Sequence, residues 1–147
     1  GEMAIITAMA DQIIPRTDTP GALDAGVPAY IDRMASGYYS DIDRGVLRAG
    51  LIQVATDTME FRGKTFDELS SEDQITLMKK YDQAQYQQTR QNTGAPPHFF
   101  RMIKELTIIG FCVSEPGATK VMKYAQTPGG MYRGDVPYSE IGKAWAT

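Results

Sequence analysis

The chain has 147 residues, of which 42% are hydrophobic and 22% are charged, and its net charge is −3. This size and composition indicate one globular domain with an ordinary core, and they argue against disorder. The negative charge, with basic residues scattered along the sequence, gives no electrostatic basis for binding nucleic acid or an anionic membrane. No apolar run reaches the ~18–20 residues that span a bilayer.

Cysteine and histidine each occur once in the chain. A single cysteine excludes an internal disulfide bond. Zinc and iron–sulfur sites usually draw on several cysteine or histidine ligands, so the sequence predicts no metal-ligating residues.

Helical spacing of apolar residues predicts the first three elements. One helix ends before Pro15, and a second begins near Pro28, which suits the first turn of a helix. A third helix follows, with Ser40 or Asp41 as its N-cap and Gly63 as its end.

Two glycines interrupt the pattern of the third helix. Gly45 and Gly50 each cost about 1 kcal/mol of helix propensity. We therefore expect both to allow close packing against a neighbouring helix. The acidic residues of the same helix, Asp57 among them, are expected on a solvated face.

The fourth helix is predicted from a capping box, with Ser71 as the N-cap and Gln74 as its partner. It turns polar in its second half and ends near residue 92. A fifth helix follows two prolines, and from Thr107 to Val113 it is apolar on every face. Such a helix is buried, either in the middle of a bundle or under another chain. We interpret it as the central helix.

The sequence after the fifth helix is rich in turn residues and shows no clear period. We predict an all-α fold, a compact helical bundle of about five helices with a long irregular C-terminal segment and no convincing strand. Residues 1–147 form a single domain, in which 126–147 are a mostly irregular tail packed on the bundle or on a partner. Long irregular segments in compact domains are usually functional.

Two stretches are candidates for a partner interface. Proline, glycine and aspartate are concentrated in residues 13–28, which predicts a pre-shaped segment that is either a rigid connector or a docking loop. The tail carries aromatic and arginine side chains of the kind enriched at interface hot spots, although it could equally fold back on the bundle with its tryptophan as an anchor. The candidate interface residues are Arg16, Thr17, Asp18, Tyr132, Arg133, Tyr138 and Trp145.

The sequence gives little support for a catalytic site. There is no nucleotide-binding fingerprint and no nucleophile elbow. His98 is the one side chain with an ordinary pKa near neutrality, and Glu105 lies two helical turns later, so an acid–base pair is the weakest hypothesis. A helix-start histidine bonded to backbone, and a Cys112 that packs as a small hydrophobe, are the preferred interpretations. We predict no catalytic and no cofactor-binding residues.

Two motifs in this order resemble the gluconate 2-dehydrogenase subunit 3 family, over a region from about Met9 to Ala146. The first is long and fairly specific, and the second is looser. The first consists of residues 13–22 (IIPRTDTPGA) with Ala25-Gly26-Val27 and Ile31-Asp32; the second consists of residues 114–119 (SEPGAT) with Tyr124, Pro128-Gly129 and Ala144-Trp145-Ala146.

The resemblance implies a small, non-catalytic accessory subunit of a bacterial flavin-dependent sugar, glycoside or polyol dehydrogenase. Members of the family typically pair with a large subunit of the glucose-methanol-choline type, which carries FAD, and some complexes add a cytochrome subunit. The small subunit usually bears the export signal and has a chaperone-like role, helping its partner to mature and reach the periplasm.

Residues 1–147 show no export signal, so the periplasmic location rests on the family and on a signal removed before residue 1. The alternative is a stand-alone helical envelope binding protein without a dehydrogenase partner.

Overall fold

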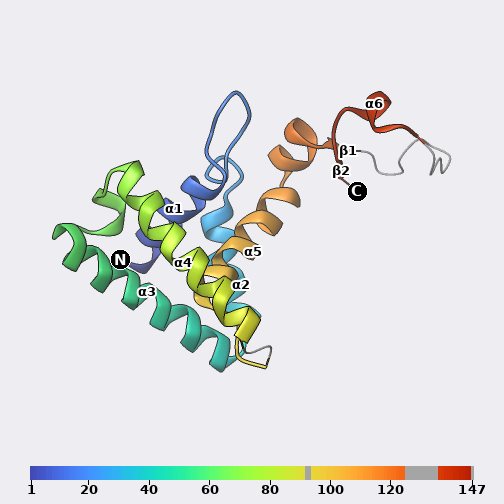
Figure 1. Ribbon diagram of the computed structural model, residues 1–147. Helices are drawn as coiled ribbons and strands as arrows, with labels where there is room; N and C mark the ends of the chain where they lie inside the picture. The colour runs from blue at the N-terminus through green and yellow to red at the C-terminus, as the bar shows by residue number, and fades with distance from the viewer. Residues whose placement is uncertain (92–93, 125–135, 147) are drawn as a thin grey trace.

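The computed structural model describes residues 1–91, 94–124 and 136–146. Five helices form its body, and shorter elements lie between and after them (Figure 1). The body helices are α1 (Glu2–Ile13), α2 (Val27–Gly37), α3 (Asp41–Arg62), α4 (Ser71–Gln91) and α5 (Phe99–Cys112). The shorter elements are η1 (Phe66–Glu68), η2 (Gly117–Val121), β1 (Lys123–Tyr124), α6 (Tyr138–Ile141) and β2 (Trp145–Ala146). The predicted all-α bundle is confirmed.

Local sequence sets most helix ends. Pro28 lies in the first turn of α2. The Ser40 hydroxyl caps α3 by accepting a hydrogen bond from the Asp43 amide at 3.1 Å. Gly63 ends α3 in the left-handed conformation, with φ of 65°.

The start of α4 differs from the prediction. Ser70, not Ser71, is the N-cap, because its hydroxyl accepts a hydrogen bond from the Asp73 amide at 3.2 Å. Ser71 and Gln74 serve tertiary contacts instead. The Ser71 hydroxyl donates to Gln12 of α1, and the buried Gln74 amide donates to the Phe66 carbonyl at 2.8 Å. Both polar groups have partners from other elements, which the local pattern could not show, and only Gln74 is buried.

The core lies around α5, which packs against α1, α2, α3 and α4. The prediction of a central helix is therefore confirmed. Side chains from all parts of the body meet there, and the fully buried ones include Met9, Val27, Ile31, Val54, Phe66 and Ile103.

The two glycines of α3 have different surroundings. A Cβ on Gly50 would lie 2.0 Å from the Phe99 ring, so glycine is required for α3 to cross α5 at this distance. Gly45 is exposed, and a Cβ there would meet no atom within 4 Å. The expectation of close packing is confirmed for Gly50 and wrong for Gly45 within this chain.

Asp57 is not a solvated surface residue, because its side chain is only 11% exposed. Its carboxylate accepts hydrogen bonds from Gln53 at 2.6 Å, Tyr81 at 2.9 Å and Lys80 at 3.1 Å. Burial acts to raise the pKa of Asp57, but these donors outweigh it and hold the pKa below its ordinary value. The cluster ties α3 to α4.

A two-residue parallel pair joins the two parts of the described C-terminal segment. β1 pairs with β2, with Lys123 opposite Trp145, and the Lys123 amide donates to the Ala144 carbonyl at 2.8 Å. The sequence showed no convincing strand, because two residues are too short for a visible period and their pairing partner lies more than twenty residues away along the chain.

Candidate interaction surface

The last turns of α5 expose apolar side chains. Ile108 and Ile109 are each 48% exposed, and Val113, just after the helix, is 70% exposed. Cys112 lies one turn beyond Ile108 on the same face and is half-buried. These four residues, called here the α5 end patch, belong to the segment predicted to be buried. Within the described chain the bundle covers only its other face, through Leu106, Thr107, Gly110 and Phe111.

The described C-terminal segment lies beyond the helical body rather than folded back on it (Figure 1). β1 and β2 make their main contacts with each other and with η2, which in turn contacts the end of α5. The Lys123 ammonium lies 4.8 Å from the centre of the Trp145 ring, a cation–π contact within this segment. We call Lys123–Tyr124 together with residues 136–146 the C-terminal arm.

The arm contains two of the candidate interface residues. The Tyr138 side chain is exposed, and its hydroxyl donates to the Gly142 carbonyl at 3.3 Å. Trp145 is half-buried against Lys123. Tyr132 and Arg133 lie outside the described residues.

The segment between α1 and α2 forms a closed loop that extends from the body (Figure 1). The Ala22 amide donates to the Ile14 carbonyl at 2.8 Å and closes it. A Cβ on Gly21 would lie 2.5 Å from the backbone nitrogen of Arg16, so this closure requires glycine. The pre-shaped character predicted for residues 13–28 therefore arises from specific backbone contacts.

Arg16 is held within this loop by Asp24. Its guanidinium forms two hydrogen bonds to the Asp24 carboxylate, one of them from Nε at 2.8 Å. These bonds, with the Gly21 amide at 2.9 Å, lower the pKa of Asp24 to about 2. Thr17 and Asp18 are exposed, and the Thr17 hydroxyl donates to Asp18 at 3.0 Å. All three residues are thus exposed at the surface, and each has a hydrogen-bond partner within its own loop.

The loop and the start of the C-terminal segment lie at the same end of the molecule. The ammonium of Lys120, in η2, acts electrostatically on Asp24 and contributes to the lowering of its pKa. The α5 end patch, the arm and the loop are therefore grouped at one end.

His98 is the N-cap of α5. Its Nδ1 accepts a hydrogen bond from the Phe100 amide at 3.2 Å, and its ring stacks on Phe99 with centroids 4.7 Å apart. Burial lowers the pKa of His98, so the neutral ring that the cap needs is favoured. The preferred interpretation, a helix-start histidine bonded to backbone, matches this geometry.

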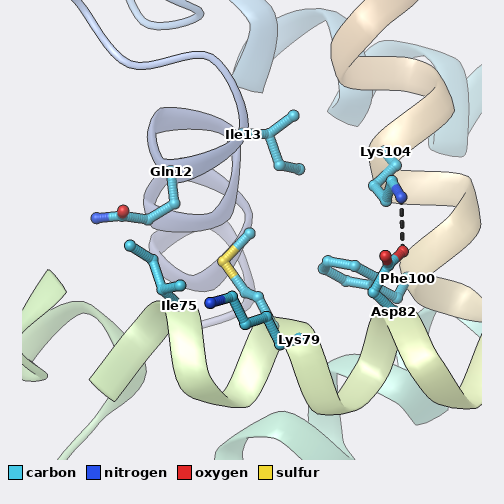
Figure 2. Close-up of a pocket in the computed structure, with 8 residues that line it drawn as sticks. Gln12, Ile13, Ile75, Lys79, Asp82, Phe100 and Lys104 are labelled. Atoms are coloured by element: carbon cyan, nitrogen blue, oxygen red, sulfur yellow. Dashed lines mark hydrogen bonds and ion pairs between the residues drawn. The ribbon is translucent and has the colours of Figure 1, made fainter. Parts of the chain in front are cut away.

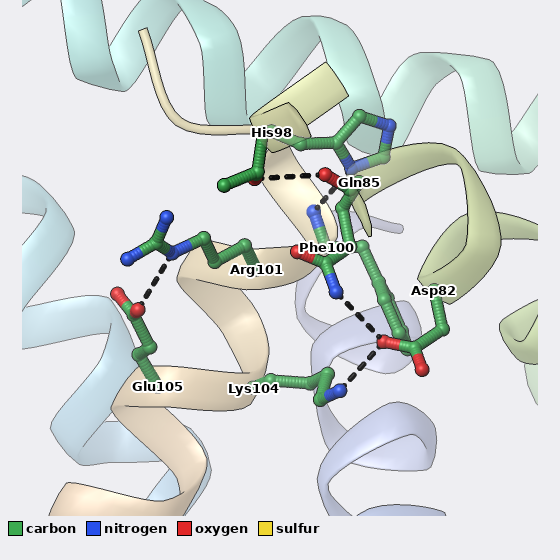
Figure 3. A network of polar contacts seen from close by, with 8 residues as sticks. Asp82, Gln85, His98, Phe100, Arg101, Lys104 and Glu105 are labelled. Atoms are coloured by element: carbon green, nitrogen blue, oxygen red, sulfur yellow. Dashed lines mark hydrogen bonds and ion pairs between the residues drawn. The ribbon is translucent and has the colours of Figure 1, made fainter. Parts of the chain in front are cut away.

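Glu105 has a different partner. It accepts a hydrogen bond from Arg101 Nε at 2.7 Å, and Figure 3 shows this pair apart from His98. On the other side of α5, Asp82 accepts hydrogen bonds from Lys104 at 2.5 Å and Gln85 at 3.1 Å, with Lys104 the main cause of its lowered pKa. The structure does not bring His98 and Glu105 together as an acid–base pair.

A pocket of about 180 Å³ lies between α1, α4 and α5 (Figure 2). Its apolar walls come from Ile13, Ile75 and Phe100, and the Asp82–Lys104 ion pair lies at its edge. This volume is below the roughly 300–1,000 Å³ of typical small-molecule sites. The pocket is better described as a surface depression than as a substrate site.

Across residues 1–91, 94–124 and 136–146, no group of three His, Cys, Asp or Glu side chains could hold a metal ion. None of the described helices is long and apolar enough to cross a membrane.

A helical body with an uncovered apolar helix end and a projecting arm defines a small protein suited to docking on a larger one. The family model of gluconate 2-dehydrogenase subunit 3 matches residues 1–129, and the chain belongs to this family. The resemblance inferred from the sequence is thereby confirmed. The chain is a small accessory subunit of a dehydrogenase complex, with a dehydrogenase subunit as its partner. Comparison with curated proteins and with solved structures gave no significant match.

Proposed function

We propose that this subunit binds a large FAD-dependent dehydrogenase subunit of the glucose-methanol-choline type through the α5 end patch and the C-terminal arm. The observation that carries the proposal is the exposure of Ile108, Ile109 and Val113 on a helix that is otherwise central to the core. Contiguous exposed apolar residues are typical of protein interaction sites.

The physical effect of such binding is to stabilise the partner. A ligand that binds only the folded state adds about 2.7 kcal/mol to stability when its concentration is a hundred times its Kd. We propose that the chain supports maturation and export of the large subunit in this way, and that the complex works in the periplasm on a sugar, glycoside or polyol. FAD belongs to the partner in this proposal, and this chain contributes no catalytic group.

Co-expression with the large subunit tests the proposal. The double variant Ile109→Glu with Val113→Glu places two charges in the patch, and we expect at least about tenfold weaker binding, since losing one hot-spot contact costs 1.4 kcal/mol or more. The control is Ile42→Glu on α3, which changes a residue of similar exposure. FAD content and solubility of the large subunit should fall with the double variant and not with the control.

A large subunit that is equally soluble, FAD-loaded and active without this chain would contradict the accessory role. Retention of full binding by the double variant would contradict the assignment of the surface.

A further inference from the structure

A compact turn connects the end of α5 to η2, and it requires a glycine. A Cβ on Gly117 would lie 1.9 Å from the Phe111 carbonyl oxygen and 2.9 Å from the carbonyl carbon, and both are backbone atoms. The requirement is one of space, because Gly117 is not among the glycines with left-handed backbone. Backbone atoms cannot move aside as the end of a flexible side chain can. The direction in which the chain leaves α5 therefore depends on this glycine.

The Ser114 side chain holds the same turn closed. Its hydroxyl donates to the Phe111 carbonyl at 2.6 Å and accepts a hydrogen bond from the Gly117 amide at 3.1 Å. The Ala118 amide adds a hydrogen bond to the Ser114 carbonyl at 2.9 Å. One side chain thus joins the last turn of α5 to the first residue of η2.

The next element, η2, connects this turn to the C-terminal arm. It is a single π-helical turn, in which the Met122 amide donates to the Gly117 carbonyl at 2.9 Å. The Val121 side chain packs against the core of the body. From the arm, the Lys143 ammonium donates to the Lys120 carbonyl at 3.1 Å. The short helix η2 is therefore in contact with both the body and the arm.

We propose that the turn from Phe111 to Gly117 is a positioning element, which holds the C-terminal arm at a fixed angle to the α5 end patch. The large subunit then meets the patch and the arm as one pre-formed surface. This inference rests on the proposed function, because the patch and the arm are the surface assigned there to the dehydrogenase subunit. Gly117 and Ser114 are positioning residues, which act on the partner through the arm.

Pre-organisation of the arm favours binding. An arm that moved freely would lose conformational freedom when it docked, and that loss would subtract from the binding free energy. The arm is too small to fix its own orientation, since its only strand pair is two residues long within the described chain and an isolated two-stranded sheet is marginally stable at best. Its orientation relative to α5 therefore comes from the turn and from η2.

The chain has one tryptophan and one cysteine, which can report this orientation. Trp145 lies in the arm, and Cys112 lies at the end of α5. Time-resolved energy transfer from Trp145 to a fluorescent label on Cys112 measures the distribution of distances between them in the isolated chain. We expect one narrow distribution in the unsubstituted chain, and a shifted or broadened one in Gly117→Ala and in Ser114→Ala.

Binding of the unlabelled variants to the large subunit tests the consequence for docking. Gly117→Ala should bind about tenfold more weakly, which is the effect of having to order one or two more side chains on binding. Ser114→Ala adds no atom to the turn and should weaken binding in the same direction. The matched control is Gly45→Ala, the same substitution at an exposed glycine whose Cβ would meet no atom within 4 Å, which should change neither the distances nor the binding. Circular dichroism melting shows which variants are folded at the temperature of the assay.

An unchanged distribution of distances in the folded variants would overturn the positioning role of the turn. A broadened distribution with full binding would overturn the claim that the large subunit needs a fixed arm. Failure of the proposed function gives a different result, because binding would then survive Ile109→Glu with Val113→Glu, whereas the distances are measured in the isolated chain and do not depend on the large subunit.

Discussion

At the scale of single residues, His98 couples the stability of α5 to pH. Its neutral Nδ1 caps the helix, and its pKa in the folded chain lies below the ordinary value of 6.5. The unfolded chain therefore binds a proton at a higher pH than the folded chain does. Stability contributed by this group is present above pH 6.5 and falls as the pH is lowered through that value.

We expect the free energy of unfolding, measured by urea denaturation, to decrease as the pH falls from 7.5 to 5.5. His98→Asn should remove most of this slope, because asparagine caps a helix without titrating. The chain has no second histidine to obscure the effect. An unchanged slope in the variant would show that the cap does not depend on the proton state of His98.

Asp24 and Asp18 give a second comparison at this scale. Asp24 binds Arg16 and the Gly21 amide, whereas Asp18 is exposed and accepts a bond from its neighbour Thr17. Asp24→Asn should lower the melting temperature of the chain by a few degrees at most, because the ion pair is solvent-exposed. Asp18→Asn should leave it unchanged. Equal effects of the two changes would contradict the role of Asp24 as the clamp of the loop.

At the scale of elements, the crossing of α3 and α5 depends on Gly50. Gly50→Ala should destabilise the chain by about 1–3 kcal/mol, because the added methyl group meets the Phe99 ring. Gly45→Ala has free space and should stabilise α3 by up to about 1 kcal/mol through helix propensity. Denaturant titration measures both changes in the free energy of unfolding.

The test is whether Gly50→Ala and Gly45→Ala change the free energy of unfolding in opposite directions. If both alanine variants shift stability in the same direction, the Gly50–Phe99 approach does not govern the crossing.

Sequence patterns predicted the elements well where the signal was local. Prolines, the Ser40 cap and Gly63 set helix ends as expected. The errors arose where tertiary contacts determined the structure. The Gln74 side chain does not cap α4 and instead donates a hydrogen bond to the Phe66 carbonyl. Asp57 is largely buried, and its carboxylate accepts hydrogen bonds from three donors there.

The candidate surface was predictable in part. The all-round apolar pattern of residues 107–113 predicted burial, and the alternative of burial under another chain is the one that the exposed Ile108 and Ile109 favour. No local pattern could show which face of α5 the bundle covers. That choice depends on how four other helices pack around it.

At the scale of the whole molecule, the surface that we propose for the dehydrogenase subunit lies at one end. The α5 end patch, the C-terminal arm and the loop are grouped there, whereas α3 runs along the edge of the body away from the arm (Figure 1). A substitution on the outer face of α3 therefore serves as a control for one in the α5 end patch.

Hydrogen–deuterium exchange of the chain, alone and with the large subunit, shows which surface of the chain the large subunit covers. Buried interfaces slow the exchange of their backbone amides, so we expect protection of residues 106–121 and of the C-terminal arm when the large subunit is bound. Residues 42–59, on α3, should exchange at the same rate with and without the large subunit. Protection confined to α3, with the end of α5 exchanging as fast as in the free chain, would contradict the account.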